Sequence, residues 1–100
     1  TIDLPIEKNK RSAYLDYDKL DFPLTLRTWK EGDWFIPFGM KGRKKLSDYF
    51  SDHKFSRIEK ERTWLLCSGD AIVWVVGERT DNRFRMDEST KRVLIVNFLG

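Results

Sequence analysis

Alternation of apolar and polar positions predicts strands in the first part of the chain. In the segment FPLTLRTW, residues 22–29, the alternate positions 22, 24 and 26 are apolar, which is typical of a strand with one buried face. The side chains expected on that face are Phe22, Leu24 and Leu26. A weaker alternation over 13–20 predicts a short strand. The run WFIPF predicts another over 34–38, which ends or lies at a sheet edge at Pro37 because proline has no backbone N–H.

Helical periodicity replaces this alternation in the middle of the chain. Over about 44–53, larger side chains recur at the spacing of one helix face, and they are Leu46, Tyr49, Phe50 and His53. A second short helix is expected over 56–62. There Ser56 stands three residues before Glu59, the spacing of a capping box.

Strand patterns return in the last third. The apolar runs 64–67 and 71–76 flank Ser68-Gly69-Asp70, which predicts a β-hairpin. A short strand is expected over 83–86 and a well-marked one over 92–99. The order of elements indicates an α+β fold, with one or two helices inserted into mainly antiparallel sheets.

Composition limits the possible architectures. The chain has 100 residues, 40% of them hydrophobic and 35% charged, which suits one globular domain. We expect a flexible lead-in or linker over 1–12 and a single domain over 13–100. Cys67 has no second cysteine to pair with and lies in an apolar run, so it is expected to be a buried thiol in a reducing, cytoplasmic protein. No apolar run is long enough to cross a bilayer.

The residues suggest no catalytic or metal site. The single His53 and single Cys67 lie in separate segments, and His53 is expected at the end of a helix face rather than as a ligand or a base. The carboxylate pairs Asp16/Asp18 and Asp87/Glu88 stand in charged surroundings, which is typical of a solvated surface. No cofactor is therefore expected in this domain.

The segment GMKGRKK, residues 39–45, is the strongest candidate for a binding site. It combines Gly39 and Gly42, which are expected to shape a loop, with a cluster of cations beside the predicted helix start. Such a surface suits phosphates, although an ordinary solvated turn would have the same composition. Two further basic groups occur, Lys54, Arg57, Lys60 and Arg62, and then Arg79, Arg83, Arg85, Lys91 and Arg92. The aromatic residues Trp34 and Phe38 are expected in the core.

A family resemblance becomes recognisable at this point. The stretches GDWFIPFGMKGRKKLSDYF, GDAIVWVVGERTDNRF and TKRVLIV closely resemble the C-terminal domain of bacterial tRNA(Ile)-lysidine synthetases, over about residues 24–97. The resemblance implies a β-sandwich-like fold with helices, shared with a domain of the phenylalanyl-tRNA synthetase β chain. It also implies that the catalytic N-terminal domain of the parent enzyme is absent from this chain.

The resemblance also carries functional expectations. The parent enzyme is expected to use ATP with magnesium to adenylate the wobble cytidine of tRNA(Ile) and then to join lysine to it. The domain is expected to contact the acceptor-stem side of tRNA(Ile). Its expected partners are that tRNA and its own catalytic domain, with a homodimer possible and no membrane. The residues expected to meet RNA phosphates are Lys41, Arg43, Lys44, Lys45, Arg57 and Arg62.

Two other functions compete with RNA contact. The apolar strands could form an interface with the catalytic domain or with a second subunit, in which case binding would depend little on salt. An independent enzyme would need a cleft with perturbed acid–base residues, and the sequence indicates none.

Overall fold

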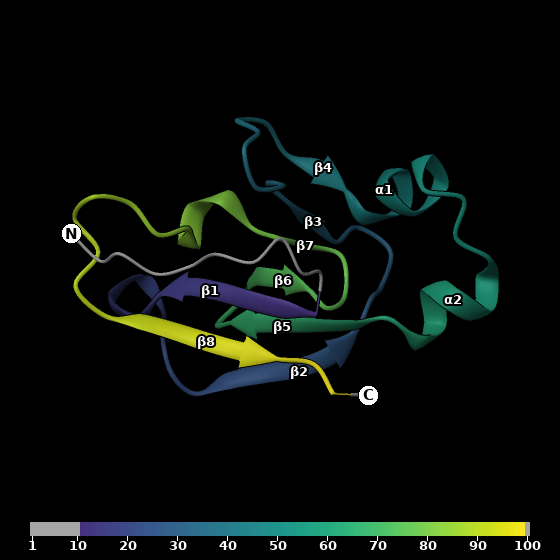
Figure 1. Cartoon of the computed structure of the whole chain (residues 1–100). Helices are drawn as coiled ribbons and strands as arrows, with labels where there is room; N and C mark the ends of the chain where they lie inside the picture. The colour runs from purple at the N-terminus through teal and green to yellow at the C-terminus, as the bar shows by residue number, and fades with distance from the viewer. Residues whose placement is uncertain (1–10, 100) are drawn as a thin grey trace.

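A four-stranded antiparallel sheet forms the centre of the computed structural model, which describes residues 11–99 (Figure 1). Its strands, in spatial order, are β2 (Leu24–Thr28), β5 (Trp64–Ser68), β6 (Ala71–Val75) and β7 (Arg79–Thr80). Two antiparallel pairs accompany it, β1 (Ser12–Asp16) with β8 (Val93–Asn97) and β3 (Trp34–Phe35) with β4 (Lys44–Lys45). The helices are α1 (Leu46–Asp52) and α2 (Arg57–Arg62). The predicted α+β fold with mainly antiparallel sheets is confirmed.

Both faces of the central sheet are covered, which explains why β5 and β6 are almost continuously apolar. On one face, Leu65 and Val75 pack with Phe35 of β3 and with Leu46 and Phe50 of α1. On the other face, side chains of the β1–β8 pair cover β5 and β6 and are joined by Leu20 and Phe84. Strands buried on both sides lose the apolar–polar alternation that marks a half-exposed strand.

A β-bulge at Val73 decides which side chains face the β1–β8 pair. Leu66 pairs with Trp74 and Cys67 pairs with Ile72, so Val73 is the extra residue. The extra residue interrupts the alternation of side chains, and both Val73 and Trp74 pack toward the β1–β8 pair. The carbonyl of Val73 accepts a hydrogen bond of 2.8 Å from the backbone N–H of Asp81. The bulge therefore fixes the segment that follows β7.

The predicted hairpin and the second helix are confirmed. β5 and β6 join through the turn at Gly69-Asp70. At the start of α2, the Ser56 hydroxyl accepts from the Glu59 N–H and the Glu59 carboxylate accepts from the Ser56 N–H, which is the predicted capping box. Cys67 is buried, and burial raises the pKa of its thiol.

The first helix is shorter than predicted. Lys44 and Lys45 belong to β4, because they pair with Phe35 and Trp34, and the helix begins only at Leu46. The helix face is confirmed for Leu46, Tyr49 and Phe50, all of which are buried. His53 follows the helix and is exposed, with its ring stacked on that of Tyr49 at 4.0 Å between centroids.

Three strand predictions need correction. The segment 83–86 is no strand, because residues Asn82–Phe84 form a 3-10 helix capped by the Asp81 side chain. The strand expected over 34–38 ends at Phe35, and Pro37 makes only an isolated bridge to Asp81. On β2, the expected buried face is covered only in part: Leu24 packs against the cluster under the β1–β8 pair, whereas Leu26 is 59% exposed because β2 is the edge strand and Leu26 lies outside both apolar clusters.

β1 is the first strand among the described residues. β1 begins at Ser12, and the rest of the expected lead-in, residues 1–10, lies outside the described residues. β1 ends at Asp16, where residues Tyr17–Lys19 form a 3-10 helix in place of the end of the predicted strand. Among residues 11–99, no helix combines the length and the apolar character needed to span a bilayer.

Candidate nucleic-acid interface

The loop between β3 and β4, residues 36–43, is fastened to the segment around β7. The Asn82 N–H donates to the Ile36 carbonyl at 2.6 Å, and the Phe38 N–H donates to the Thr80 carbonyl at 2.9 Å. The side-chain oxygen of Asn82 accepts from the Gly39 N–H at 3.1 Å. Because these bonds bind backbone groups, they fix the shape of the loop whatever its side chains contact.

A tight turn forms the tip of this loop. The Met40 N–H donates to the Pro37 carbonyl at 2.8 Å, and Gly39 has a φ of +86°, a value that favours glycine over any residue with a Cβ. Pro37 is buried beneath the turn. Gly42, the other glycine expected to shape the loop, lies outside the left-handed region. The turn therefore requires glycine at 39, and the structure shows no such requirement at 42.

Asp81 is the polar centre of the loop's attachment. Its side chain is 0% exposed and accepts hydrogen bonds of 2.8 Å from the backbone N–H groups of Ile36 and Arg83. The Arg83 guanidinium donates to the same carboxylate through Nε and Nη2, each at 2.9 Å. A buried carboxylate with both a counter-ion and backbone donors is fully satisfied, and it joins β3 to the segment after β7.

Trp34 stacks against two arginines at the surface, although the sequence suggested a position in the core. The guanidinium carbon of Arg43 lies 4.0 Å from the ring centroid and that of Arg83 lies 4.7 Å from it. Trp34 is half-buried, so its ring holds both cations by cation–π attraction at the surface of the protein. The contact orders both side chains, and only Arg43 has no carboxylate partner among residues 11–99, because Arg83 is paired with Asp81.

The cations expected in the loop lie together, but they are not equivalent. Lys41, Arg43 and Lys45 are exposed and have no ion pair with any carboxylate among residues 11–99. Lys44 pairs with Asp52 of α1, and this contact lowers the pKa of the Asp52 carboxyl group. Lys44 is therefore already partly neutralised within the protein.

The start of α1 is less available for binding a phosphate than the sequence suggested. The Leu46 N–H, the first of the helix, donates to the Asp33 carbonyl at 2.9 Å. This first amide is therefore not free to bind a phosphate, and the exposed side chains of the loop supply positive charge beside it.

The cations expected on α2 lie apart from the loop. In Figure 1, α1 separates the loop and β4 from α2. Arg57 has a 3.4 Å ion pair with Glu61, and Arg62 is exposed at the end of the helix. The structure therefore brings together Lys41, Arg43, Lys44 and Lys45, but it does not bring Arg57 and Arg62 to the same place.

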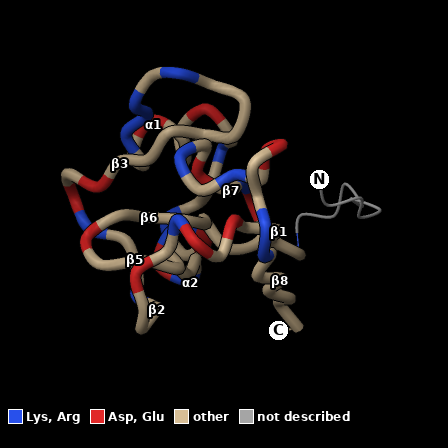
Figure 2. Tube along the Cα trace, turned by 90° about the vertical axis from the view of Figure 1, so that its left-hand side faces the viewer, with Lys and Arg blue, Asp and Glu red and all other residues tan. Residues whose placement is uncertain are grey.

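Arg79 and Arg83 join the loop, although sequence spacing grouped them with other cations. A guanidinium nitrogen of Arg79 donates to the Phe38 carbonyl, and Arg83 stacks on Trp34. Figure 2 shows Lys and Arg on the loop at the top of the view and on β7 below it. The pairing of β7 with β6 brings these arginines to the loop. No local sequence motif predicts that pairing. We call Lys41, Arg43, Lys44, Lys45 and Arg79 the loop surface.

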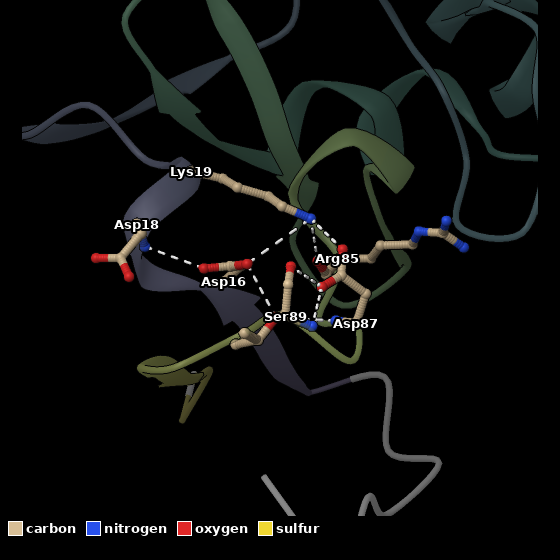
Figure 3. A network of polar contacts seen from close by, with 7 residues as sticks. Asp16, Asp18, Lys19, Arg85, Asp87 and Ser89 are labelled. Atoms are coloured by element: carbon tan, nitrogen blue, oxygen red, sulfur yellow. Dashed lines mark hydrogen bonds and ion pairs between the residues drawn. The ribbon is translucent and has the colours of Figure 1, made fainter. Parts of the chain in front are cut away.

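Lys19 and Arg92 are paired with acids in a separate polar cluster, which joins the 3-10 helix after β1 to the chain before β8. Figure 3 shows the Lys19 ammonium bridging the Arg85 carbonyl and the Asp87 carboxylate, at 3.0 and 2.9 Å, while the Arg85 side chain points away. Hydrogen bonds from Ser89 and then from Lys19 hold the pKa of Asp87 well below its usual range.

Buried Asp16 completes this network. It accepts from the Thr90 hydroxyl at 2.9 Å, and Arg92 pairs with Asp18 beside it. This cluster fastens the chain before β8 to the 3-10 helix after β1. Within residues 11–99, no group of His, Cys, Asp and Glu side chains is arranged to hold a metal ion.

Comparison with known proteins agrees with this architecture. The family model described as TilS substrate C-terminal domain matches residues 24–96. A tRNA(Ile)-lysidine synthase of Parabacteroides distasonis is 97% identical over 100 residues, which are 100% of this chain and 23% of that protein. A tRNA(Ile)-lysidine synthase of Bacteroides thetaiotaomicron is 57% identical over 95% of this chain and 22% of its own length. The chain thus spans less than a quarter of these relatives.

Two solved structures share the fold. The crystal structure of a TILS C-terminal domain superposes with a TM-score of 0.82 at 25% identity, covering 95% of this chain and 75% of that one. An N-terminal fragment of the phenylalanyl-tRNA synthetase β-subunit from Pyrococcus horikoshii superposes with a TM-score of 0.70 at 20% identity, covering 84% of this chain and 26% of that one. The expected likeness to that synthetase is confirmed at the level of the fold.

Proposed function

The chain belongs to the TilS substrate C-terminal domain family, and we propose that it holds tRNA by its phosphates within a longer tRNA-modifying ligase. One observation carries this proposal: Lys41, Arg43 and Lys45 stand exposed, with no carboxylate partner among residues 11–99, on and beside a loop whose backbone is fastened to β7. Cations held in place but not neutralised by the protein are suited to an external polyanion.

The chemistry of the loop surface fits a folded RNA better than a particular sequence. A-form RNA presents phosphates and 2′-hydroxyls on its outside and hides its base edges in a deep, narrow groove, so a protein grips it mainly through charge and shape. Lysine and arginine side chains spread over one loop and one neighbouring strand supply that grip. We place the RNA contact on the acceptor-stem side of tRNA(Ile).

The longer protein would carry the chemistry. By analogy with the relatives named above, we propose that it is a cytoplasmic tRNA(Ile)-lysidine synthase that uses ATP and magnesium to attach lysine to the wobble cytidine. We propose that ATP and magnesium bind in the remainder of the longer protein. The present domain would act by positioning the tRNA for that catalytic domain.

Fluorescence anisotropy of a labelled acceptor-stem hairpin, measured over a range of salt concentrations, tests the RNA contact. We expect the affinity of the wild-type chain to fall steeply with salt, because each neutralised phosphate adds about −0.9 to the log–log slope. The double variant Lys41→Ala/Lys45→Ala removes two unpaired cations and leaves the Trp34 stack intact. It should weaken binding and make the slope shallower by about two.

Two other double variants remove the same charge elsewhere. Arg57→Ala/Arg62→Ala tests whether α2 contacts RNA phosphates, as expected from the sequence. Arg85→Ala/Lys91→Ala removes exposed cations near the Figure 3 network and is the matched control. Equal weakening by all three variants would mean that only net charge matters, which contradicts a defined interface. A folded wild-type chain that binds no RNA at low salt would overturn the proposal.

A second candidate function rests on an exposed apolar area at the open edge of the central sheet. Leu26 is opposite Leu66 and Trp64 is opposite Thr28 in the β2–β5 pairing, so Leu26 and Trp64 lie on the same sheet face. Both side chains are exposed. This area could dock onto the catalytic domain or onto a second copy of the chain. Such an interface would weaken little with salt, which separates it from RNA binding.

A further inference from the structure

The tip of the 36–43 loop exposes two apolar side chains that the core does not use. Phe38 is 51% exposed and Met40 is 44% exposed, although the sequence suggested that Phe38 would be a core residue. Phe38 pairs with no other aromatic ring among residues 11–99. An aromatic ring at the end of a loop, with half of its surface in water, is available to stack on a partner.

The backbone under this ring is fully engaged. The Phe38 N–H donates to the Thr80 carbonyl at 2.9 Å, and its carbonyl accepts from Arg79. The next N–H, that of Gly39, donates to Asn82, and the turn closes from Met40 to Pro37. Because this backbone is already constrained, it loses little conformational entropy when the side chain binds a partner. More of the contact free energy therefore contributes to the affinity.

Cations lie on the chain segments next to Phe38. The Arg79 guanidinium is bound to the Phe38 carbonyl itself, Lys41 follows Met40 directly, and Arg43 is held over Trp34 nearby. A flat apolar group between cations matches the two components of a nucleic acid strand, since aromatic rings stack on bases while cations track the phosphates. A protein partner would have to bring acidic groups beside an apolar pocket.

The partner must also offer the face of a base. Inside an A-form duplex both faces of every base are stacked on neighbours, so a ring outside the helix has access only to an unpaired or terminal base. Resting on the proposed function, we propose that Phe38, supported by Met40, stacks on an unpaired nucleobase at a junction between helix and single strand. The loop surface holds the phosphates of the adjoining helix. Phe38 thereby directs the domain to the end of a stem.

Two hairpin RNAs separate stacking from phosphate contact. One has a blunt stem, and the other has the same stem with a short single-stranded 3′ overhang that contains 2-aminopurine, whose fluorescence is quenched when it stacks. Anisotropy gives the affinity of the 100-residue chain for each RNA, and the fluorescence reports the base. We expect the wild-type chain to prefer the overhang and to quench the 2-aminopurine.

Variants at Phe38 isolate the ring. Phe38→Leu keeps an apolar side chain on the same backbone and removes the aromatic face, so it should lose at least about fivefold in affinity for the overhang, the low end of base–aromatic stacking. Its affinity for the blunt stem and its salt slope should stay unchanged. Phe38→Trp should retain the preference for the overhang. Phe22→Leu is the matched control, because Phe22 is 49% exposed but lies outside the loop.

The outcomes distinguish the two proposals. If Lys41→Ala/Lys45→Ala weakens binding while Phe38→Leu binds both RNAs as the wild type does, phosphate contact stands and stacking is wrong. An equal loss on both RNAs, or an overhang that is never quenched, also overturns stacking. If neither RNA binds the folded wild-type chain at low salt, the RNA function itself is wrong and stacking falls with it.

Discussion

Removing the carboxylate of Asp81 should destabilise the domain more than any change to a surface charge. Asp81 is 0% exposed and accepts from two backbone N–H groups and from two nitrogens of Arg83. Asp81→Ala leaves the Ile36 N–H without its acceptor and Arg83 without its counter-ion. It also releases the cap of the Asn82–Phe84 3-10 helix.

The magnitude follows from what stays buried after the change. Breaking a buried ion pair by removing one partner costs about 3–5 kcal/mol when the other charge remains out of water. The Arg83 side chain is 35% exposed and can turn toward solvent, so we expect the lower end, about 3 kcal/mol. For a domain of this size each kcal/mol lowers Tm by about 4–8 °C, which gives a fall of roughly 12–24 °C.

Urea and thermal unfolding followed by circular dichroism measure this loss. Asp81→Asn keeps an acceptor oxygen but no charge, and it should fall between the wild type and Asp81→Ala. Glu88→Ala removes an exposed carboxylate that takes no part in the ion pairs of residues 11–99, and it should change the free energy of unfolding by less than about 0.5 kcal/mol. A loss below about 1 kcal/mol for Asp81→Ala would refute the role given to this carboxylate.

Two further predictions concern the same half of the molecule. Burial alone would raise the pKa of Asp33, but hydrogen bonds from the Arg27 guanidinium and the Lys30 N–H outweigh burial and lower that pKa. The charged carboxylate therefore stabilises the fold at neutral pH, and this stabilisation is lost as the pH falls through the lowered pKa. Asp33→Asn should therefore lower stability at pH 7 and flatten its dependence on pH between about pH 5 and pH 2 in urea titrations, and an unchanged profile would contradict the pairing. Gly39→Ala places a Cβ at a φ of +86° and should cost about 1 kcal/mol in unfolding experiments, whereas an equally stable variant would show that the turn adapts.

Local signals in the sequence predicted the elements whose causes are local. The capping box at Ser56 and Glu59, the hairpin turn at Gly69-Asp70 and the apolar face of α1 each depend on residues a few positions apart, and the structure confirms all three. The exposure of Leu26 could not be predicted in this way. It depends on where the covering layers end over β2, which is a property of the assembled sheets.

The candidate site was predictable only in part. The cations of 41–45 were identified as a group because they are adjacent in sequence. The contribution of Arg79 and Arg83, the exposure of Phe38 and the pairing of Lys44 with Asp52 depend on contacts between distant segments. The separation of Arg57 from the loop has the same origin, because α1 intervenes only once the chain has folded.

Because the loop is hydrogen-bonded to the segment around β7, the loop surface can form only after that segment has been synthesised. The acceptors and donors that shape the turn at Phe38 and Gly39 belong to Thr80 and Asn82, which leave the ribosome long after the loop itself. A nascent chain that ended after β6 would contain the cations of residues 41–45, yet it would lack Arg79 and the partners that hold the loop backbone in place. The basic loop is therefore synthesised early and shaped late, and its binding geometry becomes available only with the last part of the domain.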